Sequence, residues 1–172
     1  MNKINIDNWK EFKMSEIGFD NYHGRRLKKS DRIEGDIPFI TAGKENQGVV
    51  GCIGNNRDTY ENPITIDMFG NVFYHEGKFA GDDNIYFFVN PNINKYQKLF
   101  IVGALQSFIR SVFAYADQFR QDNADTLSVY LPATPLGEPD FQYMEEYIKN
   151  IERQQSHNLQ IIKLLIPPLI KM

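Results

Sequence analysis

The feature that most constrains this chain is a seam of apolar residues near its C-terminal end. Residues 141–166 favour a single helix, which Pro167 and Pro168 terminate. The seam positions alternate in steps of three and four residues; they are Phe141, Met144, Ile148, Ile151, Gln155, Asn158, Ile162 and Leu165. This is coiled-coil spacing, in which buried polar residues such as Gln155 and Asn158 set the register and the number of partners. The seam therefore predicts a dimerisation or docking arm.

The length and composition favour one globular domain that carries this arm. The chain has 172 residues, of which 42% are hydrophobic and 13% aromatic, enough for a core of its own. We expect the globular domain over residues 1–136 and the helical arm over residues 137–172. Because Cys52 is the single cysteine, neither an internal disulfide framework nor a cysteine-based zinc cluster can form, which favours a reducing cytoplasm. We expect no signal peptide, since residues 2–9 are polar and contain no apolar run, and no membrane segment, since no run of about 20 apolar residues is present.

Short runs of β-branched and aromatic residues predict several strands, separated by clusters of glycine, asparagine and aspartate. The predicted strands cover residues 37–41, 49–53, 64–69, 72–74, 85–89 and 127–131. Gly70 and Asn71 are typical of a hairpin turn. We predict a lead-in segment over residues 5–17 that packs Trp9, Phe12 and Ile17 against the domain.

The apolar period changes in the second half of the chain. Residues 95–114 carry apolar positions at helical spacing, which predicts a helix with one buried stripe. Residues 117–125 are polar and predict a loop, and residues 134–139 predict a linker before the last helix. The expected fold is therefore α+β: a globular domain rich in short strands, followed by a long C-terminal helix that forms a coiled-coil arm.

The chain lacks the short motifs of common enzyme classes. It has no Gly-x-x-x-x-Gly-Lys-Ser/Thr loop, no His-Glu-x-x-His motif and no Gly-x-Ser-x-Gly turn. It also has no Asn/Asp-Pro-Pro-Tyr/Phe tetrapeptide of amino-methyltransferases and no glycine-rich turn for S-adenosylmethionine. We therefore expect a protein that performs no chemistry and holds no cofactor or metal.

One arrangement keeps an alternative enzyme open. Asp67 lies near the end of a predicted strand, and Glu76 and Lys78 follow the next hairpin, as in the Asp and Glu-x-Lys skeleton of many restriction-type nucleases. In such a site two carboxylates hold Mg²⁺ and the lysine polarises the attacking water. The opposing interpretation is a hairpin whose tip and exposed face carry charges.

The charge distribution favours a specific surface over general attraction to nucleic acid. The net charge of −3 and the pI near 5.6 argue against a generic nucleic-acid coat, which would be basic overall. Specific DNA binding needs only one basic face. The densest positive cluster consists of Arg25, Arg26, Lys28 and Lys29, which form either a solvated loop or a set of phosphate contacts.

Several motifs, taken in order, resemble the target recognition domains of specificity (S) subunits of type I and related restriction–modification systems. These motifs are Gly35-Asp36-Ile37-Pro38-Phe39-Ile40-Thr41, Asn46-Gln47-Gly48-Val49-Val50-Gly51, Ile64-Thr65-Ile66-Asp67, Gly70-Asn71-Val72-Phe73-Tyr74, Gly77-Lys78-Phe79-Ala80, Leu127-Ser128-Val129-Tyr130-Leu131-Pro132 and Glu138-Pro139-Asp140-Phe141-Gln142-Tyr143-Met144. In that family, a full S subunit contains two recognition domains, each followed by a spacer helix. This chain carries one of each and resembles a half-subunit.

The resemblance implies a non-catalytic DNA-recognition subunit. Separate methyltransferase (modification) subunits would dock on the arm, bring S-adenosylmethionine and methylate adenine, and a motor–nuclease subunit would use ATP and Mg²⁺ where one is present. The spacer helices of a full subunit pack as an antiparallel coiled coil, so a half-subunit would form a homodimer or pair with a different half. A straight helix over residues 141–166 would be about 39 Å long, close to the roughly 34–36 Å between half-sites on double-stranded DNA.

Residues for DNA contact are chosen by their chemistry and by their position in loops. Arginine and lysine suit guanine and phosphate, asparagine and glutamine suit adenine, and aromatic rings suit thymine methyl groups. The candidates are Arg25, Arg26, Lys28, Lys29, Lys44, Asn46, Gln47, Asn56, Arg57, Tyr74, Lys78, Arg120 and Gln121. Besides DNA recognition and the nuclease, a third class stays open: an interaction module whose coiled coil acts without nucleic acid.

Overall fold

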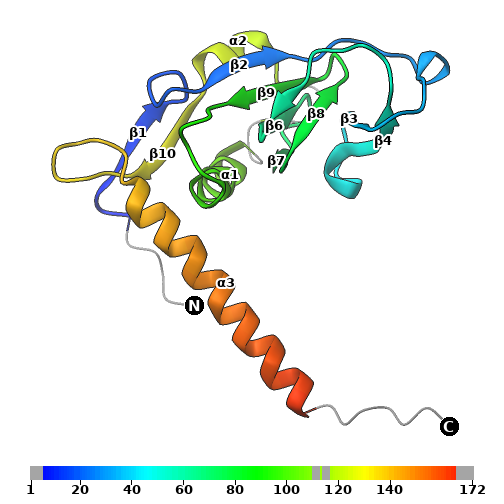
Figure 1. Ribbon diagram of the computed structural model, residues 1–172. Coiled ribbons are helices and arrows are strands. Elements are labelled where there is room, and N and C mark those ends of the chain that lie inside the picture. The colour runs from blue at the N-terminus through cyan, green and yellow to red at the C-terminus, as the bar shows by residue number, and fades with distance from the viewer. Residues whose placement is uncertain (1–5, 110–112, 114–116, 166–172) are drawn as a thin grey trace, which may run out of the picture.

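The computed structural model describes residues 6–109, 113 and 117–165, with side chains as far as residue 158. A strand-rich body carries the long helix α3 (Phe141–Leu165), which leaves the body beside β1 and β10 (Figure 1). The body also holds α1 (Lys95–Ile109) and the short α2 (Gln121–Thr126), together with 3-10 turns η1 (Lys29–Asp31) and η2 (Glu45–Gly48). This is the α+β architecture that the sequence predicts, and the prediction is confirmed.

A four-stranded antiparallel sheet forms the centre of the body, in the order β2-β9-β6-β7. Its strands are β2 (Asp20–His23), β9 (Ile85–Val89), β6 (Ile64–Asp67) and β7 (Val72–Tyr74). Tyr86 and Phe88 of β9 join the main core, which also contains buried residues of α1 such as Leu105, while Ile85 and Phe87 join a smaller cluster. The alternation places the central strands between two apolar layers, and each buried aromatic side chain contributes about 1.5–3 kcal/mol.

A second sheet covers the other side of the centre, in the order β4-β3-β8-β5. Its strands are β4 (Val49–Ile53), β3 (Ile37–Ile40), β8 (Lys78–Gly81) and β5 (Tyr60–Glu61). The β3–β8 pair is parallel, with Phe39 opposite Ala80, whereas β3–β4 and β5–β8 are antiparallel. Parallel pairing of strands far apart in sequence brings distant loops to one end of the body.

The first and last strands of the body pair with each other in a two-stranded sheet. β1 (Trp9–Lys13) pairs antiparallel with β10 (Ser128–Pro132), with Trp9 opposite Pro132. The predicted lead-in segment therefore contains a strand, although Trp9, Phe12 and Ile17 pack against the core as predicted. Residue 5 lies outside the described part of the chain.

Other differences from the predicted elements have local causes. β2, β5 and β8 are not among the predicted strands, because they are short and carry polar residues that disfavour strands in isolation. The predicted strand over residues 64–69 ends at Asp67, where the turn begins. The predicted loop over residues 117–125 is wrong in part, because α2 begins at Gln121 after the Arg120 amide donates to Asn123 Oδ1 at 2.8 Å. Helix α1 is described as far as Ile109, and residue 114 lies outside the described part.

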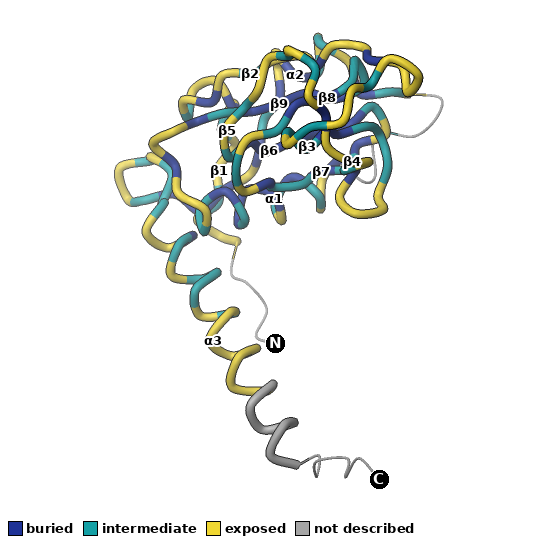
Figure 2. The backbone as a smooth tube through the Cα atoms, turned by 45° about the vertical axis from the view of Figure 1, so that its right-hand side comes forward, coloured by how far each residue is buried: buried dark blue, intermediate teal, exposed yellow. Residues whose placement is uncertain are grey.

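The first turns of helix α3 pack against the core, and the later turns leave it. Asp140 caps its N-terminus, since Asp140 Oδ1 accepts from the Tyr143 amide at 2.9 Å. Met144 is fully buried, and Tyr147 packs edge-on against Phe100 of α1 with ring centroids 5.5 Å apart. From residue 152 to residue 158 every position is exposed (Figure 2). Met144 was assigned to the partner-facing seam from the sequence, and this is corrected: its side chain belongs to the domain's own core.

The boundary expected between residues 136 and 137 stays a prediction, although the first turns of α3 pack within the body. Among the helices described here, none is both long and apolar enough to cross a membrane.

A buried histidine gives this fold a specific pH dependence. His75 is only 3% exposed, its Nε2 lies 2.9 Å from the Thr65 hydroxyl, and burial lowers its pKa from 6.5 to about 4. The unfolded chain therefore takes up this proton at a higher pH than the folded chain. Titration of His75 should leave the free energy of unfolding unchanged above pH 6.5 and should lower it by up to about 3 kcal/mol as the pH drops from 6.5 to about 4.

Urea unfolding of the unaltered chain and of His75→Gln across this pH range checks the expectation. The variant should be less stable at neutral pH. Its free energy of unfolding should change much less with pH between 6.5 and 4 than that of the unaltered chain. His157→Gln, at an exposed position on α3, is the matched control and should keep the full slope. A slope that His75→Gln leaves unchanged would contradict the assignment.

Candidate nucleic-acid interface

A buried carboxylate organises the turn between β6 and β7. Asp67 is only 4% exposed, and its two oxygens accept four hydrogen bonds. Oδ1 accepts from the amides of Phe69 and Asn71, both at 2.9 Å. Oδ2 accepts from Asn71 Nδ2 at 2.7 Å and from the amide of Gly43, in the loop after β3, at 2.9 Å. The four donors thus compensate the buried charge of Asp67, and the hydrogen bond from Gly43 connects the loop of residues 41–48 to the hairpin turn.

Backbone hydrogen bonds bring two further segments to the same turn. The Met68 amide donates to Asn84 O at 3.0 Å, which attaches the β8–β9 turn of residues 81–84. The Phe119 amide donates to Met68 O at 2.9 Å, which attaches the segment that leads into α2. The hairpin turn therefore holds segments from three other parts of the chain. This region, with residues 24–29, 41–48, 55–57 and 118–121, carries most of the DNA-contact residues predicted from the sequence, and for that prediction we call it the recognition end.

The basic cluster begins where the chain crosses the β8–β9 turn. A Cβ atom on Gly24 would lie 2.1 Å from Asp82 O, so only glycine permits this close approach. The Arg25 amide donates to Gly81 O at 3.0 Å, and the Leu27 amide donates to Asp82 Oδ1 at 2.9 Å. These bonds and the burial of Leu27 hold the backbone, so that the side chains on either side of Leu27 point into solvent.

Two aspartates orient the arginines of this cluster. Arg25 pairs with Asp58 at 3.3 Å, and Arg26 pairs with Asp83 at 3.6 Å. All four side chains are substantially exposed, so these ion pairs contribute little to stability and can exchange for phosphate contacts. Lys28 and Lys29 are exposed and make no ion pair within the described residues.

The loop of residues 54–59 joins the basic cluster. Arg57 Nη2 donates to Arg26 O at 3.2 Å, which places two predicted DNA-contact residues side by side. The side-chain amide of Asn55 forms hydrogen bonds within the protein: Nδ2 donates to Asp31 O, and Oδ1 accepts from the backbone amide of Ile33. The neighbouring Asn56 is exposed, as a base-contact candidate must be.

The loop between β3 and β4 presents the next candidates in a tight turn. Asn46 and Gln47 both have left-handed backbones, with φ of 47° and 54°. Such a backbone is costly for residues other than glycine, although asparagine tolerates it best. Asn46 Nδ2 donates to Val49 O at 3.1 Å, so this amide stabilises its own turn. Lys44 and Gln47 are exposed beside it.

The start of α2 places Gln121, one of the predicted DNA-contact residues, beside the edge strand β2. Gln121 Nε2 donates to Asn21 Oδ1 of β2 at 2.8 Å and to Asp125 Oδ1 at 2.7 Å. The side chain of Arg120 is exposed and donates to Gln118 Oε1. In Figure 1, α2 and β2 lie along the same side of the body.

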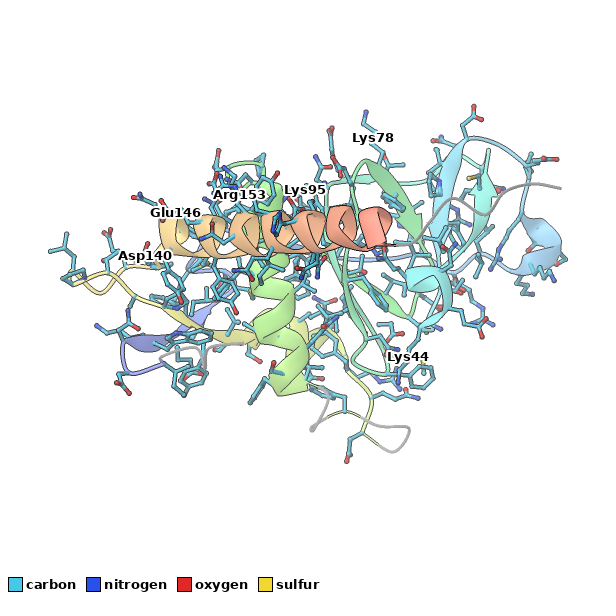
Figure 3. All side chains as sticks on the ribbon, turned by 90° about the horizontal axis from the view of Figure 1, so that it is seen from below. Lys44, Lys78, Lys95, Asp140, Glu146 and Arg153 are labelled. Carbon is cyan, nitrogen blue, oxygen red and sulfur yellow. The ribbon has the colours of Figure 1, made fainter. Side chains whose placement is uncertain are left out.

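Two candidates lie apart from the other groups. Tyr74 packs against the main core, and burial together with Glu76 raises the pKa of its hydroxyl. Lys78 is exposed, but Figure 3 shows it on the opposite side of α3 from Lys44. The structure brings the arginines, Lys44, Asn46, Gln47 and Gln121 to one end of the body and does not bring Tyr74 and Lys78 to it.

The structure also reveals an aromatic surface that sequence reasoning missed. Tyr22 stacks on Tyr60 with ring centroids 5.0 Å apart, and Tyr60 stacks on the buried Phe87 at 4.3 Å. Tyr22 is 43% exposed and, with His23 and Arg25, lines an open pocket of about 590 Å³. Tyr22 and Tyr60 lie 38 positions apart in unpredicted strands, so no local pattern could have joined them.

The nuclease alternative is wrong. The carboxylate of Asp67 is occupied by four donors, and Glu76 pairs with Lys95 at 2.9 Å. The register of the hairpin pairs Ile64 with Tyr74, so Asp67 lies at its turn and Glu76 beyond its open end. Among the described residues, no group of three or more histidine, cysteine, aspartate or glutamate side chains is placed to hold a metal ion.

Comparison with known proteins defines the class of this domain. Residues 6–169 match the type I restriction modification DNA specificity domain family, and the chain belongs to that family. It is similar to the specificity subunit S.BcgI of a type II restriction enzyme from Heyndrickxia coagulans, with 31% identity over 153 residues. The match covers 85% of this chain and 44% of that subunit. The domain is therefore a DNA specificity domain of a family that is non-catalytic.

Solved structures share the fold. The S subunit of a type I system from M. genitalium superposes with a TM-score of 0.62 at 16% identity, over 94% of this chain and 44% of that one. The HsdS subunit from Thermoanaerobacter tengcongensis superposes with a TM-score of 0.60 at 9% identity, over 91% of this chain and 40% of that one. The chain spans less than half the length of these relatives.

The role of Asp67 in holding the recognition end can be tested directly. Asp67→Ala removes all four hydrogen bonds and leaves buried donors unpaired, so the free energy of unfolding should fall by roughly 2–4 kcal/mol. Glu76→Ala removes one exposed ion pair with Lys95 and should cost less than about 1 kcal/mol. Urea unfolding measures both changes. Equal effects of the two substitutions would show that Asp67 does not organise this region.

Proposed function

We propose that this chain recognises one half of a bipartite double-stranded DNA site for a restriction–modification system. The observation that carries the proposal is the match to the DNA specificity domain over residues 6–169, which include both the globular body and α3. The body supplies the reading surface at the recognition end, and α3 supplies the connection to a second reading surface. The chain itself performs no chemistry in this proposal.

The chemistry of the recognition end supports DNA contact there. It gathers Arg25, Arg26, Arg57 and Arg120 from loops that are otherwise far apart. Arginine and lysine position DNA through phosphates, while arginine, glutamine and asparagine can also read base edges in the major groove. The overall charge of −3 leaves little general attraction, so binding depends on this surface and on its partner copy.

The exposed part of α3 supports pairing with a second copy. The structural relatives are more than twice as long as this chain, so a second domain and helix would complete an assembly of their size. The 25-residue α3 is about 38 Å long, close to the roughly 34–36 Å separation of neighbouring half-sites. A two-fold homodimer would read an inverted repeat, and pairing with a different half would read an asymmetric site.

Partner subunits complete the proposed activity. Methyltransferase subunits would dock on the exposed arm and methylate adenine with S-adenosylmethionine, and a motor–nuclease subunit would join where the system has one. The assembly would act in the cytoplasm, where the cell's DNA and incoming foreign DNA are both accessible.

The salt dependence of DNA binding tests the basic cluster. Lys28→Ala together with Lys29→Ala should lower affinity and reduce the slope of log Kobs against log salt by about 0.9 for each phosphate that the protein no longer neutralises. The probe is a duplex selected from a random pool by the unaltered chain with its methyltransferase subunits. The matched control is Lys10→Ala with Lys13→Ala on β1, which should leave the slope unchanged. Equal slopes for the two double variants would remove these lysines from the interface.

The solution mass tests the arm. Ile162→Asp places a charge on the seam beyond the body, so it should raise the dimer dissociation constant by about tenfold or more. Ser156→Asp adds the same charge at an exposed position off the seam and should leave the constant within about twofold. Sedimentation equilibrium measures both. A dimer that tolerates Ile162→Asp would show that α3 is not the interface.

A further inference from the structure

An apolar groove of about 570 Å³ runs between α1 and α3 where α3 leaves the body. Gly103, Ser107 and Phe108 of α1 form one wall, and Ile148 and Ile151 of α3 form the other. Tyr130 of β10 also lines the groove. Two of these residues also belong to the predicted coiled-coil seam, so the groove and the seam are one continuous surface.

Two aromatic side chains that line this groove are exposed in the described part of the chain. Phe108 is 53% exposed and Tyr130 is 54% exposed, which is high for aromatic side chains that border an apolar groove. Small residues of α1 line the groove, and there is open space beside Gly103, because a Cβ atom on it would meet no other atom within 4 Å. An apolar groove of this shape matches the side chains of an incoming helix.

The far part of α3 carries matching chemistry in its sequence. Residues 152–158 are polar and exposed, whereas the continuation contains Leu159, Ile161, Ile162, Leu164 and Leu165. In an antiparallel pair with Ile151 opposite the partner's Gln155, position 162 of one helix comes opposite Met144 of the other. Met144 is fully buried in its own core and offers the partner no side chain. The apolar far end therefore needs a different surface, and the groove lies next to this position.

We propose that the groove between α1 and α3 receives the far part of α3 from a second copy of this chain. The inference rests on the dimerisation described under Proposed function and adds α1 and β10 to the interface. Each arm would then contact the partner's body as well as the partner's arm. Contact at both ends would set the angle between the two bodies, and hence the spacing and phase of the two recognition ends on DNA.

Substitutions at Gly103 test the proposal without touching α3. Gly103→Ala adds a methyl group in open space and should leave the dimer dissociation constant within about twofold. Gly103→Glu puts a charge into the groove and should raise this constant by about tenfold or more. Thermal unfolding at monomeric concentration should be the same for both, because both residues favour a helix more than glycine does. Sedimentation equilibrium that shows equal constants for both variants would overturn the proposal.

Disulfide trapping identifies the occupant. In a Cys52→Ser background, a tagged chain with Ser107→Cys is mixed with an untagged chain with Leu159→Cys and oxidised. A mixed disulfide at about 40 kDa, twice the 20.0 kDa chain, supports docking in the groove. Ser30→Cys in place of Ser107→Cys is the matched control at an exposed position on η1 and should give none. Equal trapping at both positions would overturn the proposal.

The two proposals fail in distinguishable ways. Suppose that Ile162→Asp separates the dimer, while Gly103→Glu leaves the dissociation constant unchanged and the cysteine pair forms no mixed disulfide. The groove proposal then fails, and the proposal of a dimeric DNA-recognition subunit is kept. If the unaltered chain stays monomeric and binds no selected DNA duplex with its methyltransferase subunits, the proposed function fails, and the groove proposal fails with it.

Discussion

The carboxylate of Asp67 is the interaction on which the recognition end depends. A buried charge is tolerated only when it is fully hydrogen-bonded, and Asp67 meets this condition with four donors. Three of these donors are backbone amides, of Gly43, Phe69 and Asn71, so they do not depend on loop side chains. The loops can therefore carry different side chains while the backbone at this end keeps its position.

The second constraint is the anchoring of α3. Met144 enters the core, and Tyr143 and Tyr147 pack edge-on against Phe100, so the first turns of the helix have a defined direction relative to the body. The exposed turns that follow project into solvent (Figure 2). A rigidly attached arm transmits the geometry of a dimer to the recognition ends, whereas a flexible linker would leave their spacing undefined. In the proposed dimer, half-site spacing would therefore depend on packing between α1 and α3, far from the proposed DNA contacts.

Sequence reasoning succeeded where a pattern was local and failed where an element was stabilised from outside. β7 and β9 match the predicted ranges, because β-branched and aromatic runs favour strands by themselves. β2 contains Asp20, Asn21 and His23 and is a strand only because β9 pairs with it. In the candidate interface, the basic cluster was visible as a run of charges. Its contact with Arg57 and the stacking of Tyr22 on Tyr60 were not visible, since each joins residues about 30 or more positions apart.

By itself, the sequence determined the presence of the long helix, the α+β class and the membership of a DNA specificity family. These follow from periodicity, composition and ordered motifs, which are written along the chain. Only the tertiary structure decided that Asp67 supports loops instead of binding a metal, that Tyr74 packs against the core, and that Met144 is withdrawn from the seam. The physical reason is that burial and pairing depend on which distant segments meet. A seam with ideal spacing looks the same in sequence whether a partner helix or the chain's own core covers it.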